Sequence, residues 1–353
     1  MDIQHLRIEN ISKIAMFTDI HFGCHNNSSE HSHDCMNFID WFITQCKREK
    51  VDAVVFLGDW WENRNSISVQ TLKYGIHCIR KLNQLNIPIF LIIGNHDLFH
   101  RHHRDIHSAE AFREFSNVVI IDNNALKIND ELLILPFLFK DEYPEVVNEV
   151  NNSKYVFGHF EFRHFFITGT NTRHEHGYSH KLFDGPTHIF SGHFHKRQAT
   201  ENVIYIGNPF GTSYADAGDF DRGACILDVD SSDVDFLNYD GPSYVKTQLS
   251  LLLEGDVEIK KFARVRCLID IDISYSEAQL LKKEYMEMYE LREFILEENV
   301  IERQHALEES AIAELDELDQ STIDETIKKL IESGVQSTTT INPKKLIKIY
   351  GEL

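Results

Sequence analysis

Carboxylate, amide and imidazole side chains recur at short spacings over the first two hundred residues, in the proportions that a pair of metal ions requires. The candidate ligands are Asp19, His21, Asp59, Asn95, His159, His193 and His195. Two ions about 3.5–4 Å apart need roughly seven or eight protein ligands and one bridging group. Asp59 is the candidate bridge, because a carboxylate has two oxygens whereas an imidazole gives one nitrogen to one metal. The pattern therefore predicts a two-metal site.

The spacing of the paired ligands supports this prediction. Asp19-x-His21 and His193-x-His195 each place two ligands on one side of an extended segment. Mixed oxygen and nitrogen ligands suit Mn²⁺ best, with Fe²⁺ or Zn²⁺ as alternatives. A lone Asp or His has a simpler explanation as a turn former or a surface residue, so the argument depends on the whole ordered series.

Each motif follows a short apolar run that predicts a β-strand. The predicted strands lie in KIAMFTD, VDAVVFLGD and IPIFLIIGNHD and at 117–122, 131–137, 154–159, 187–192, 203–207, 223–229 and 234–239. Apolar residues at helical spacing over 35–46 and after Ser68 predict amphipathic helices between strands. This alternation indicates an α/β fold with a sheet covered by helices, in which ligands bind at the carboxyl ends of the strands.

A glycine comes directly before several of the candidate ligands, and the reason we infer is steric. These residues are Gly58, Gly94, Gly158 and Gly192. A turn without a Cβ atom lets the next side chain point into a crowded site.

Composition excludes some classes of protein. The chain of 353 residues is 42% hydrophobic and 26% charged, as in soluble globular proteins, and its 20 histidines favour metal or phosphate chemistry. No apolar run approaches the ~18–20 residues of a membrane-spanning helix, and the N-terminus lacks the apolar core of a secretory signal. Because the six cysteines form no C-x-x-C pair, we expect reduced thiols and a cytoplasmic protein.

The net charge of −21 argues against a broad nucleic-acid-binding surface. A nuclease of this composition must hold DNA through a local patch, through its metals or through a partner chain.

The pattern changes near residue 241. We predict a domain with the two-metal site over 1–240, a small α+β cap over 241–305 and an acidic, helical tail over 306–353. In the cap, Ser274-x-x-Glu277 and Ser276-x-x-Gln279 both offer capping boxes for a long helix over about 276–297. In the tail, apolar stripes predict short helices at 323–331 and after Pro343.

The ordered series D-x-H, G-D, G-N-H-D, G-H and G-H-x-H resembles the calcineurin-like metallophosphoesterase superfamily. Within it, the chain is most similar to SbcD-type nuclease subunits of double-strand-break repair, especially the short subunits of phage recombination endonucleases. The similarity is clearest over 14–240 and includes GHFE at 158–161, SGHFH at 191–195, YIGNPF at 205–210 and the DRG near 221. It implies a sandwich of β-sheet flanked by helices and a Mn²⁺-dependent exonuclease or endonuclease.

The resemblance also implies roles for individual residues. One metal would take Asp19, His21, Asp59 and His195, and the other Asp59, Asn95, His159 and His193. His96 matches the family's catalytic histidine beside the scissile phosphate, and Asp97 would orient its ring. The implied partners are DNA and an SbcC-like coiled-coil ATPase, docked through the C-terminal helices. The implied assembly is a homodimer within a heterotetramer, in the cytoplasm of a bacterial host if a phage encodes the chain.

The chain departs from the family pattern in two places. Where some relatives have a histidine three residues after the bridging aspartate, this chain has Glu62, so a second histidine that assists catalysis is not carried over. The chain also starts about a dozen residues before the first strand of the motif series, an extension for which the sequence gives no account.

Two clusters of basic residues could contact phosphate groups around the site. Residues 96–107 hold five histidines with Arg101 and Arg104, and a second cluster after His159 includes Arg163 and Arg173. The alternative is a solvated polar loop.

Two other functions remain open from the sequence. One is a different phosphoesterase: a protein phosphatase, a cyclic-nucleotide phosphodiesterase or a lipid-precursor hydrolase. Protein phosphatases of the superfamily usually carry an arginine just before the N-H motif, where this chain has Ile93-Gly94. The other is an inactive scaffold of the same fold, which typically loses ligands, and none is missing here.

Overall fold

The computed structural model describes residues 1–167 and 172–298. Almost all of them belong to the first of two units, formed by 1–267 and 273–296. The second unit, 268–272 with 297–353, lies mostly outside the described residues, as do the predicted tail and its two helices.

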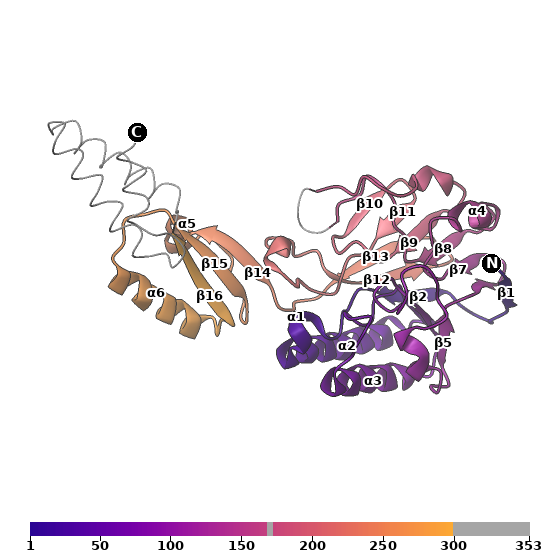
Figure 1. Ribbon diagram of the computed structural model, residues 1–353, viewed down its shortest axis with the longest axis horizontal. Coiled ribbons are helices and arrows are strands. Elements are labelled where there is room, and N and C mark those ends of the chain that lie inside the picture. Colours follow the sequence, from indigo (N-terminus) through magenta and orange to yellow (C-terminus); the bar gives the residue numbers. More distant parts are fainter. Residues whose placement is uncertain (168–171, 299–353) are drawn as a thin grey trace, which may run out of the picture. The chain divides into compact units, whose positions relative to one another are not determined.

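A six-stranded sheet carries the first three motifs at its centre (Figure 1). Its order is β13 (Val234–Asn238), β12 (Gly223–Asp228), β2 (Lys13–Phe17), β3 (Ala53–Phe56), β4 (Ile89–Ile92) and β5 (Val118–Ile121). Strands β2 to β5 are parallel, whereas β12 runs antiparallel to β2. Central parallel strands are apolar throughout because both of their faces are covered, and β3 and β4 are buried at every position.

A seven-stranded sheet carries the remaining motifs. Its order is β1 (Ile3–Leu6), β6 (Ala125–Ile128), β7 (Leu132–Ile134), β8 (Tyr155–Gly158), β9 (His188–Ser191), β11 (Val203–Tyr205) and β10 (Gln198–Thr200). The N-terminal extension is explained here, because β1 pairs in parallel with β6 and adds an edge strand. Strands β1, β6 and β10 are short and were not predicted from the sequence.

The two sheets pack face to face around an apolar core. Alternate residues of one sheet, such as Met16, Val55 and Phe90, contact Phe157 and Phe190 of the other. The opposite faces of β2 and β3 turn Phe17 and Phe56 toward helices. This period of two is the expected consequence of strand geometry, and it confirms the predicted α/β class with sheets flanked by helices.

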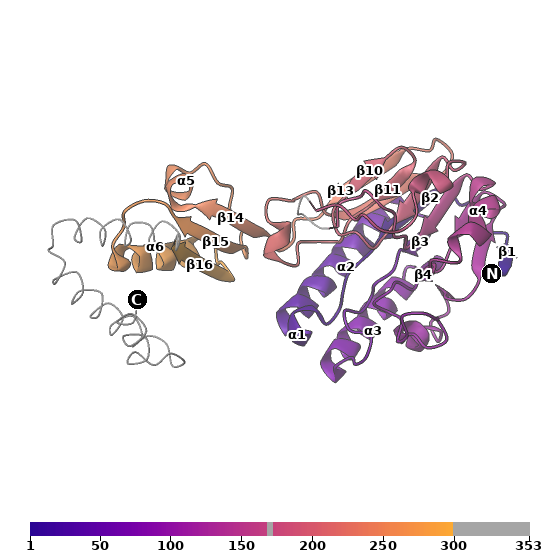
Figure 2. The same ribbon diagram turned by 45° about the horizontal axis from the view of Figure 1, so that its top comes forward.

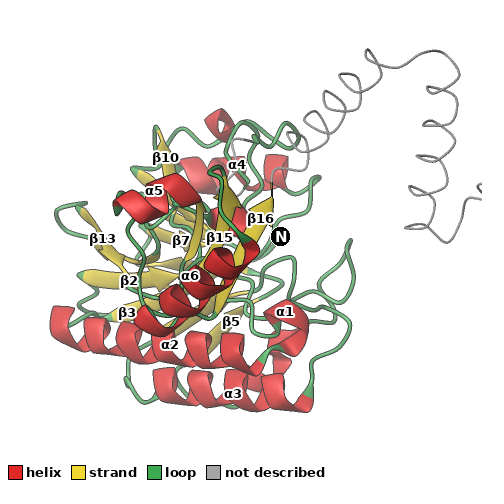
Figure 3. Cartoon of the chain, turned by 90° about the vertical axis from the view of Figure 1, so that its left-hand side faces the viewer, coloured by secondary structure: helices red, strands yellow, loops and turns green. Residues whose placement is uncertain are grey.

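Two long helices cover the outer face of the six-stranded sheet and lie side by side (Figures 2 and 3). They are α2 (Ser29–Glu49) and α3 (Val69–Asn83). The side chains of Ser28 and Ser68 accept hydrogen bonds from backbone N–H groups at the two helix starts. The shorter α1 (Cys24–Asn27) precedes α2, and α4 (Tyr143–Asn151) packs on the seven-stranded sheet. Single 3₁₀ turns occur at Ser108–Phe112, His180–Leu182 and Tyr214–Asp216.

The segment after residue 241 forms a three-stranded sheet with two helices. The elements are β14 (Tyr244–Gln248), α5 (Leu249–Glu254), β15 (Arg264–Ile269), α6 (Tyr275–Met288) and β16 (Glu293–Glu298). The predicted capping box at Ser274 is present. The prediction of one helix over 276–297 is wrong, because α6 ends at Met288 and β16 follows. The strand conformation buries Phe294, which stacks on Tyr285 of α6.

Among the described residues, no helix is long and apolar enough to span a lipid bilayer.

Candidate metal centre

The predicted ligands meet where the carboxyl ends of strands from both sheets approach each other. Asp19 follows β2, Asp59 follows β3 and Asn95 follows β4 in the six-stranded sheet. His159 follows β8, and the pair at 193 and 195 follows β9, in the seven-stranded sheet. Parallel strands end at one edge of each sheet, so motifs far apart in sequence become neighbours.

Glycines allow the loops at this edge to approach one another closely, as predicted. A Cβ atom on Gly94 would lie 2.1 Å from Oδ1 of Asp59, and one on Gly58 would lie 2.4 Å from Nδ1 of His159. Gly58 has a φ of 106°. Asp59 follows it with a φ of 60°, an uncommon backbone conformation for a residue with a side chain. The crowding therefore fixes where the Asp59 carboxylate points.

One half of the site contains two imidazoles and a carboxylate. Nε2 of His21 lies 3.1 Å from Nε2 of His195. Oδ1 of Asp19 lies 3.8 Å from the first of these nitrogens and 3.9 Å from the second. Three ligand atoms from two sheets thus surround one small volume.

The other half is built around an amide oxygen. Oδ1 of Asn95 lies 3.0 Å from Nε2 of His159 and 2.9 Å from Nδ1 of His193. The carboxylate of Asp59 is next to this group, with Oδ2 at 3.5 Å from Nε2 of His159.

Asp59 lies between the two halves. Its Oδ2 atom is 3.5 Å from Nε2 of His159 and 3.8 Å from Nε2 of His21. Its Oδ1 atom accepts a hydrogen bond of 2.8 Å from the backbone N–H of His96, which holds the carboxylate in place. The structure therefore places this carboxylate where a bridging ligand would stand.

The contacts on the far side of the histidines show that this donor set fits cations. Nδ1 of His159 donates to the carbonyl oxygen of Leu57 at 2.7 Å, and Nδ1 of His21 lies 2.9 Å from Oε2 of Glu62. In a neutral ring whose proton is on Nδ1, the remaining Nε2 carries a lone pair. Each Nε2 lone pair therefore faces other hydrogen-bond acceptors, such as the carboxylate of Asp59. Acceptors that face one another cannot form hydrogen bonds, but they can all bind a metal cation.

Electrostatics leads to the same conclusion. Burial opposes protonation of His159, yet the charge of Asp59 raises the pKa of that imidazole to about 9. Burial likewise opposes a charge on His21, but its contact with Glu62 and the charge of Asp59 raise the pKa to about 9. Burial would raise the pKa of Asp59, but the neighbouring His159 and His21 hold it well below its usual range. The site favours positive charge, which divalent ions supply.

Not all the imidazoles behave in this way. Burial, together with the neighbouring His159, lowers the pKa of His193 well below its usual value. Burial and the neighbouring His21 lower the pKa of His195. Both rings are therefore neutral near pH 7, the form in which imidazole binds a metal.

The prediction that Asp97 orients the ring of His96 is wrong. Asp97 is 0% exposed, and its two carboxylate oxygens accept hydrogen bonds of 2.9–3.3 Å from four backbone N–H groups. The donors are those of Asp59, Trp60, Trp61 and Gly94. The side chain points back under the loop after β3, so it positions Asp59 instead. Burial raises the pKa of Asp97 to about 6.

His96 is partly buried beside the candidate ligands, and its ring lies 4.9 Å from that of His21, centroid to centroid. Nδ1 donates to the backbone carbonyl oxygen of Glu62 at 2.7 Å. A peptide carbonyl therefore does the orienting that the sequence suggested for Asp97. Nε2 remains as the nitrogen that can exchange a proton with a bound molecule.

One of the four arginines predicted to contact substrate has a structural role. Arg104 is 8% exposed. It donates to the carbonyl oxygen of Phe137 at 2.8 Å, forms an ion pair with Glu142 and lies over the ring of Phe139. We therefore withdraw Arg104 as a DNA contact. Arg101, Arg163 and Arg173 are exposed, as their predicted role requires.

Three residues that support the ligands were not singled out as site residues from the sequence. Thr18 donates to the Asp19 carboxylate at 2.7 Å. Arg222, in the DRG segment, is buried and donates to the carbonyl oxygen of His195 at 3.1 Å. Glu62 was noted only as a departure from the family pattern. The sequence alone gives only a weak signal for such supporting residues. Thr and Arg are common in loops, and their hydrogen bonds to a ligand become visible only in the folded structure.

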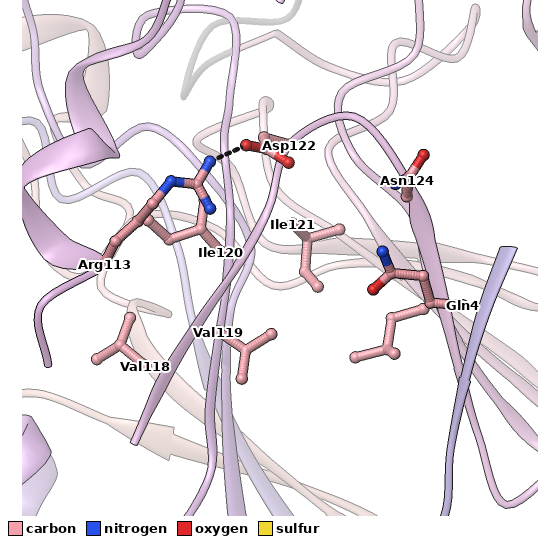
Figure 4. Close-up of a pocket in the computed structure, with 9 residues that line it drawn as sticks. Gln4, Arg113, Val118, Val119, Ile120, Ile121, Asp122 and Asn124 are labelled. Atoms are coloured by element: carbon pink, nitrogen blue, oxygen red, sulfur yellow. Dashed lines mark hydrogen bonds and ion pairs between the residues drawn. The ribbon is translucent and has the colours of Figure 1, made fainter. Parts of the chain in front are cut away.

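A pocket with a volume of about 420 Å³ lies elsewhere, between β5 and the edge formed by β1 and β6 (Figure 4). It contains no predicted site residue. Its lining residues are Gln4, Arg113, Val118, Val119, Ile120, Ile121, Asp122, Asn124 and Leu126. Arg113 and Asp122 form an ion pair across one side, as Figure 4 shows.

The sequence is similar to those of known proteins. The chain is 26% identical over 202 residues to exonuclease subunit 1 of Enterobacteria phage T4, and 25% identical over 217 residues to putative phosphoesterase 078R of Invertebrate iridescent virus 3. These alignments cover 55% and 57% of this chain, and in each case 58% of the relative.

The chain also aligns with two solved structures. TT1561 of Thermus thermophilus aligns with a TM-score of 0.42 at 10% identity, covering 65% of this chain and 99% of that protein. A dimetal phosphatase from Danio rerio aligns with a TM-score of 0.39 at 9% identity, covering 61% of this chain and 92% of that protein.

The family model for calcineurin-like phosphoesterases matches residues 12–197, more than half of the chain. The chain therefore belongs to the calcineurin-like phosphoesterase family.

Proposed function

We propose that this chain is the nuclease subunit of a DNA recombination and double-strand-break repair complex, and that it hydrolyses phosphodiester bonds with two Mn²⁺ ions. The observation that carries the proposal is the pair of ligand clusters with Asp59 between them. The similarity to a phage exonuclease subunit supports DNA as the substrate.

In this proposal the ligands divide as the contacts do. Asp19, His21 and His195 would hold one ion, Asn95, His159 and His193 would hold the other, and Asp59 would contribute to both. A bound pair of divalent ions supplies activation of water and stabilisation of charge on the phosphoryl oxygens. Oxygen and nitrogen ligands without a thiolate favour Mn²⁺.

His96 has a separate role in the proposed mechanism. Its Nδ1–H is held by the Glu62 carbonyl at 2.7 Å, so the ring has one orientation and one free nitrogen. Beside the scissile phosphate, Nε2 stabilises the transition state and carries the proton for the leaving oxygen. Asp97 acts only through the loop that presents Asp59.

In this proposal a partner protein supplies most of the positive charge that binds DNA. The chain has a net charge of −21, and cations are what hold the phosphate backbone. Arg101, Arg163 and Arg173 are available for local contacts. We infer that an SbcC-like coiled-coil ATPase provides the rest, within a heterotetramer that contains two copies of this chain. The name of the phage relative, a subunit, is consistent with such an assembly.

The test is cleavage of end-labelled duplex and single-stranded DNA with Mn²⁺, with and without the ATPase. Asp59→Asn is the matched control, because it keeps the side-chain shape and removes the bridging charge. We expect Mn²⁺-dependent cleavage by the natural chain, and loss of at least one ion and of cleavage in the variant. Faster hydrolysis of a phosphopeptide than of DNA, or full activity and metal content in Asp59→Asn, would contradict the proposal.

A further inference from the structure

Glu62 contacts both His21 and His96, and it is more exposed than the candidate ligand that it contacts. Its Oε2 atom lies 2.9 Å from Nδ1 of His21, and its side chain is 34% exposed, against 3% for His21. Its carbonyl oxygen accepts the 2.7 Å hydrogen bond from His96. The residue is thus a partly exposed neighbour of both a candidate ligand and the proposed catalytic histidine.

The backbone of Glu62 is held in this position. Its backbone N–H donates to the carbonyl oxygen of Phe22 at 3.0 Å, and Trp61 before it pairs with Phe22 in a parallel bridge. One Glu62 oxygen and one ring nitrogen each from His21 and His96 all lie within 4.8 Å of one another. Because His21 would bind a metal as a neutral ring, the Glu62 charge is not cancelled by this neighbour.

A fixed negative charge beside His96 discriminates between phosphate esters. The linking phosphate of a diester carries one negative charge, whereas a monoester carries nearly two above its second pKa of about 6. The extra charge is repelled by the carboxylate. At roughly 6–7 Å and an effective dielectric constant of about 20–40, this repulsion corresponds to about a 7- to 100-fold difference.

We propose that Glu62 is a specificity-determining residue whose carboxylate disfavours phosphomonoesters and so restricts the centre to phosphodiesters. The inference rests on the proposed function, because it places the scissile phosphate beside His96. The inference gives a function to Glu62, which stands where some relatives have a histidine.

The experiment compares three substitutions at pH 8. Glu62→Gln removes the charge but keeps an oxygen that can accept from Nδ1 of His21. Glu62→Asp keeps the charge. Glu131→Gln removes a carboxylate at the start of β7, the opposite end from the site. The substrates are bis-(p-nitrophenyl) phosphate and p-nitrophenyl phosphate, and the measured quantity is the ratio of their kcat/KM values.

Two further measurements do not depend on turnover. They are Mn²⁺ content by elemental analysis and the affinity for inorganic phosphate by calorimetry. In Glu62→Gln we expect the diester-to-monoester ratio to fall about tenfold and phosphate to bind about tenfold more tightly, with both metals retained. Glu62→Asp and Glu131→Gln should keep ratios near that of the natural chain.

An unchanged ratio in Glu62→Gln would overturn the inference. So would an equal loss on both substrates with weaker Mn²⁺ binding, because the carboxylate would then act only by orienting His21. If the natural chain cleaves neither DNA nor the diester, the proposed function fails first. If it cleaves both and only the ratio test fails, the role of Glu62 alone is wrong.

Discussion

Two buried histidines of the centre are each held from behind. Nδ1 of His159 donates to the carbonyl oxygen of Leu57, and Nδ1 of His21 lies 2.9 Å from Oε2 of Glu62, so Nε2 of each ring faces the Asp59 carboxylate. Such supporting contacts set the tautomer and the direction of a metal ligand. His96 is supported in the same way as His159, by a peptide carbonyl, here that of Glu62. Its distinction from the ligands is part of the proposed function, and the metal content of a His96 variant tests it.

The first prediction concerns His96. His96→Asn should retain both metal ions and lower turnover on DNA by roughly 10²–10⁴-fold, the usual contribution of a positioned acid. Elemental analysis and cleavage rates on one preparation measure both effects. Asp59→Asn provides the contrast, since it should lose metal together with activity. Loss of metal from His96→Asn would make this residue a ligand.

The candidate metal ligands were easier to predict from the sequence than the contacts of the residues around them. The candidate ligands could be identified because imidazole and carboxylate groups at these spacings have few other uses. The role of Asp97 could not, because the family resemblance implied a contact with His96, whereas its carboxylate accepts hydrogen bonds from four backbone N–H groups. Arg104 was misjudged for a similar reason: the sequence gives its charge but not the carbonyl group and aromatic ring that bury it.

At the scale of elements, five strand ends and the loops after them form the centre. The order β2-β3-β4 brings the first three motifs together within one sheet, and β8-β9 does the same in the other. These strands were predictable because each is an apolar run followed by a glycine or a polar ligand. Strands β1 and β6 were missed because IQHL and ALKI alternate weakly and gain their strand structure by pairing. The strand β16 was missed because EFILEE also suits a helix.

The second prediction tests the close packing of these loops. Gly94→Ala places a Cβ against both the side chain and the backbone of Asp59, at 2.1 and 2.5 Å. We expect the free energy of unfolding to fall by ~1–3 kcal/mol. Mn²⁺ affinity should fall with it, because the bridging carboxylate must move. Denaturant unfolding and calorimetric titration measure the two effects.

Gly211→Ala is the matched control for this substitution. Gly211 is also buried, but the nearest atoms to its added Cβ are at 3.4 and 3.5 Å, ordinary contact distances. It should leave Mn²⁺ affinity unchanged. Equal effects of the two substitutions would show that the closeness of the loops does not position Asp59.

At the scale of the whole molecule, the candidate centre and the acidic charge must be reconciled. All the proposed ligands lie within residues 19–195, inside the described part of the chain. The chain as a whole has 56 acidic and 35 basic residues. Charge repulsion with DNA weakens encounter, whereas the ions act only at short range because salt screens beyond about 10 Å. The DNA-binding partner proposed above would resolve this conflict, and its proposed docking segment is the pair of helices that the sequence predicts in the tail.

The last prediction concerns that segment, which lies outside the described residues. Deleting residues 321–353 should leave metal content and the slow Mn²⁺-dependent cleavage intact, because no proposed ligand is removed. It should abolish co-purification with the ATPase and any stimulation by ATP, because an apolar helical stripe that docks into a groove is lost. Substituting Ile327 and Leu330 together with aspartate should have the same effect with the chain length unchanged. If either variant aggregates or loses its metals, the predicted helices belong to the core of this chain, and the proposal that they dock an ATPase is wrong.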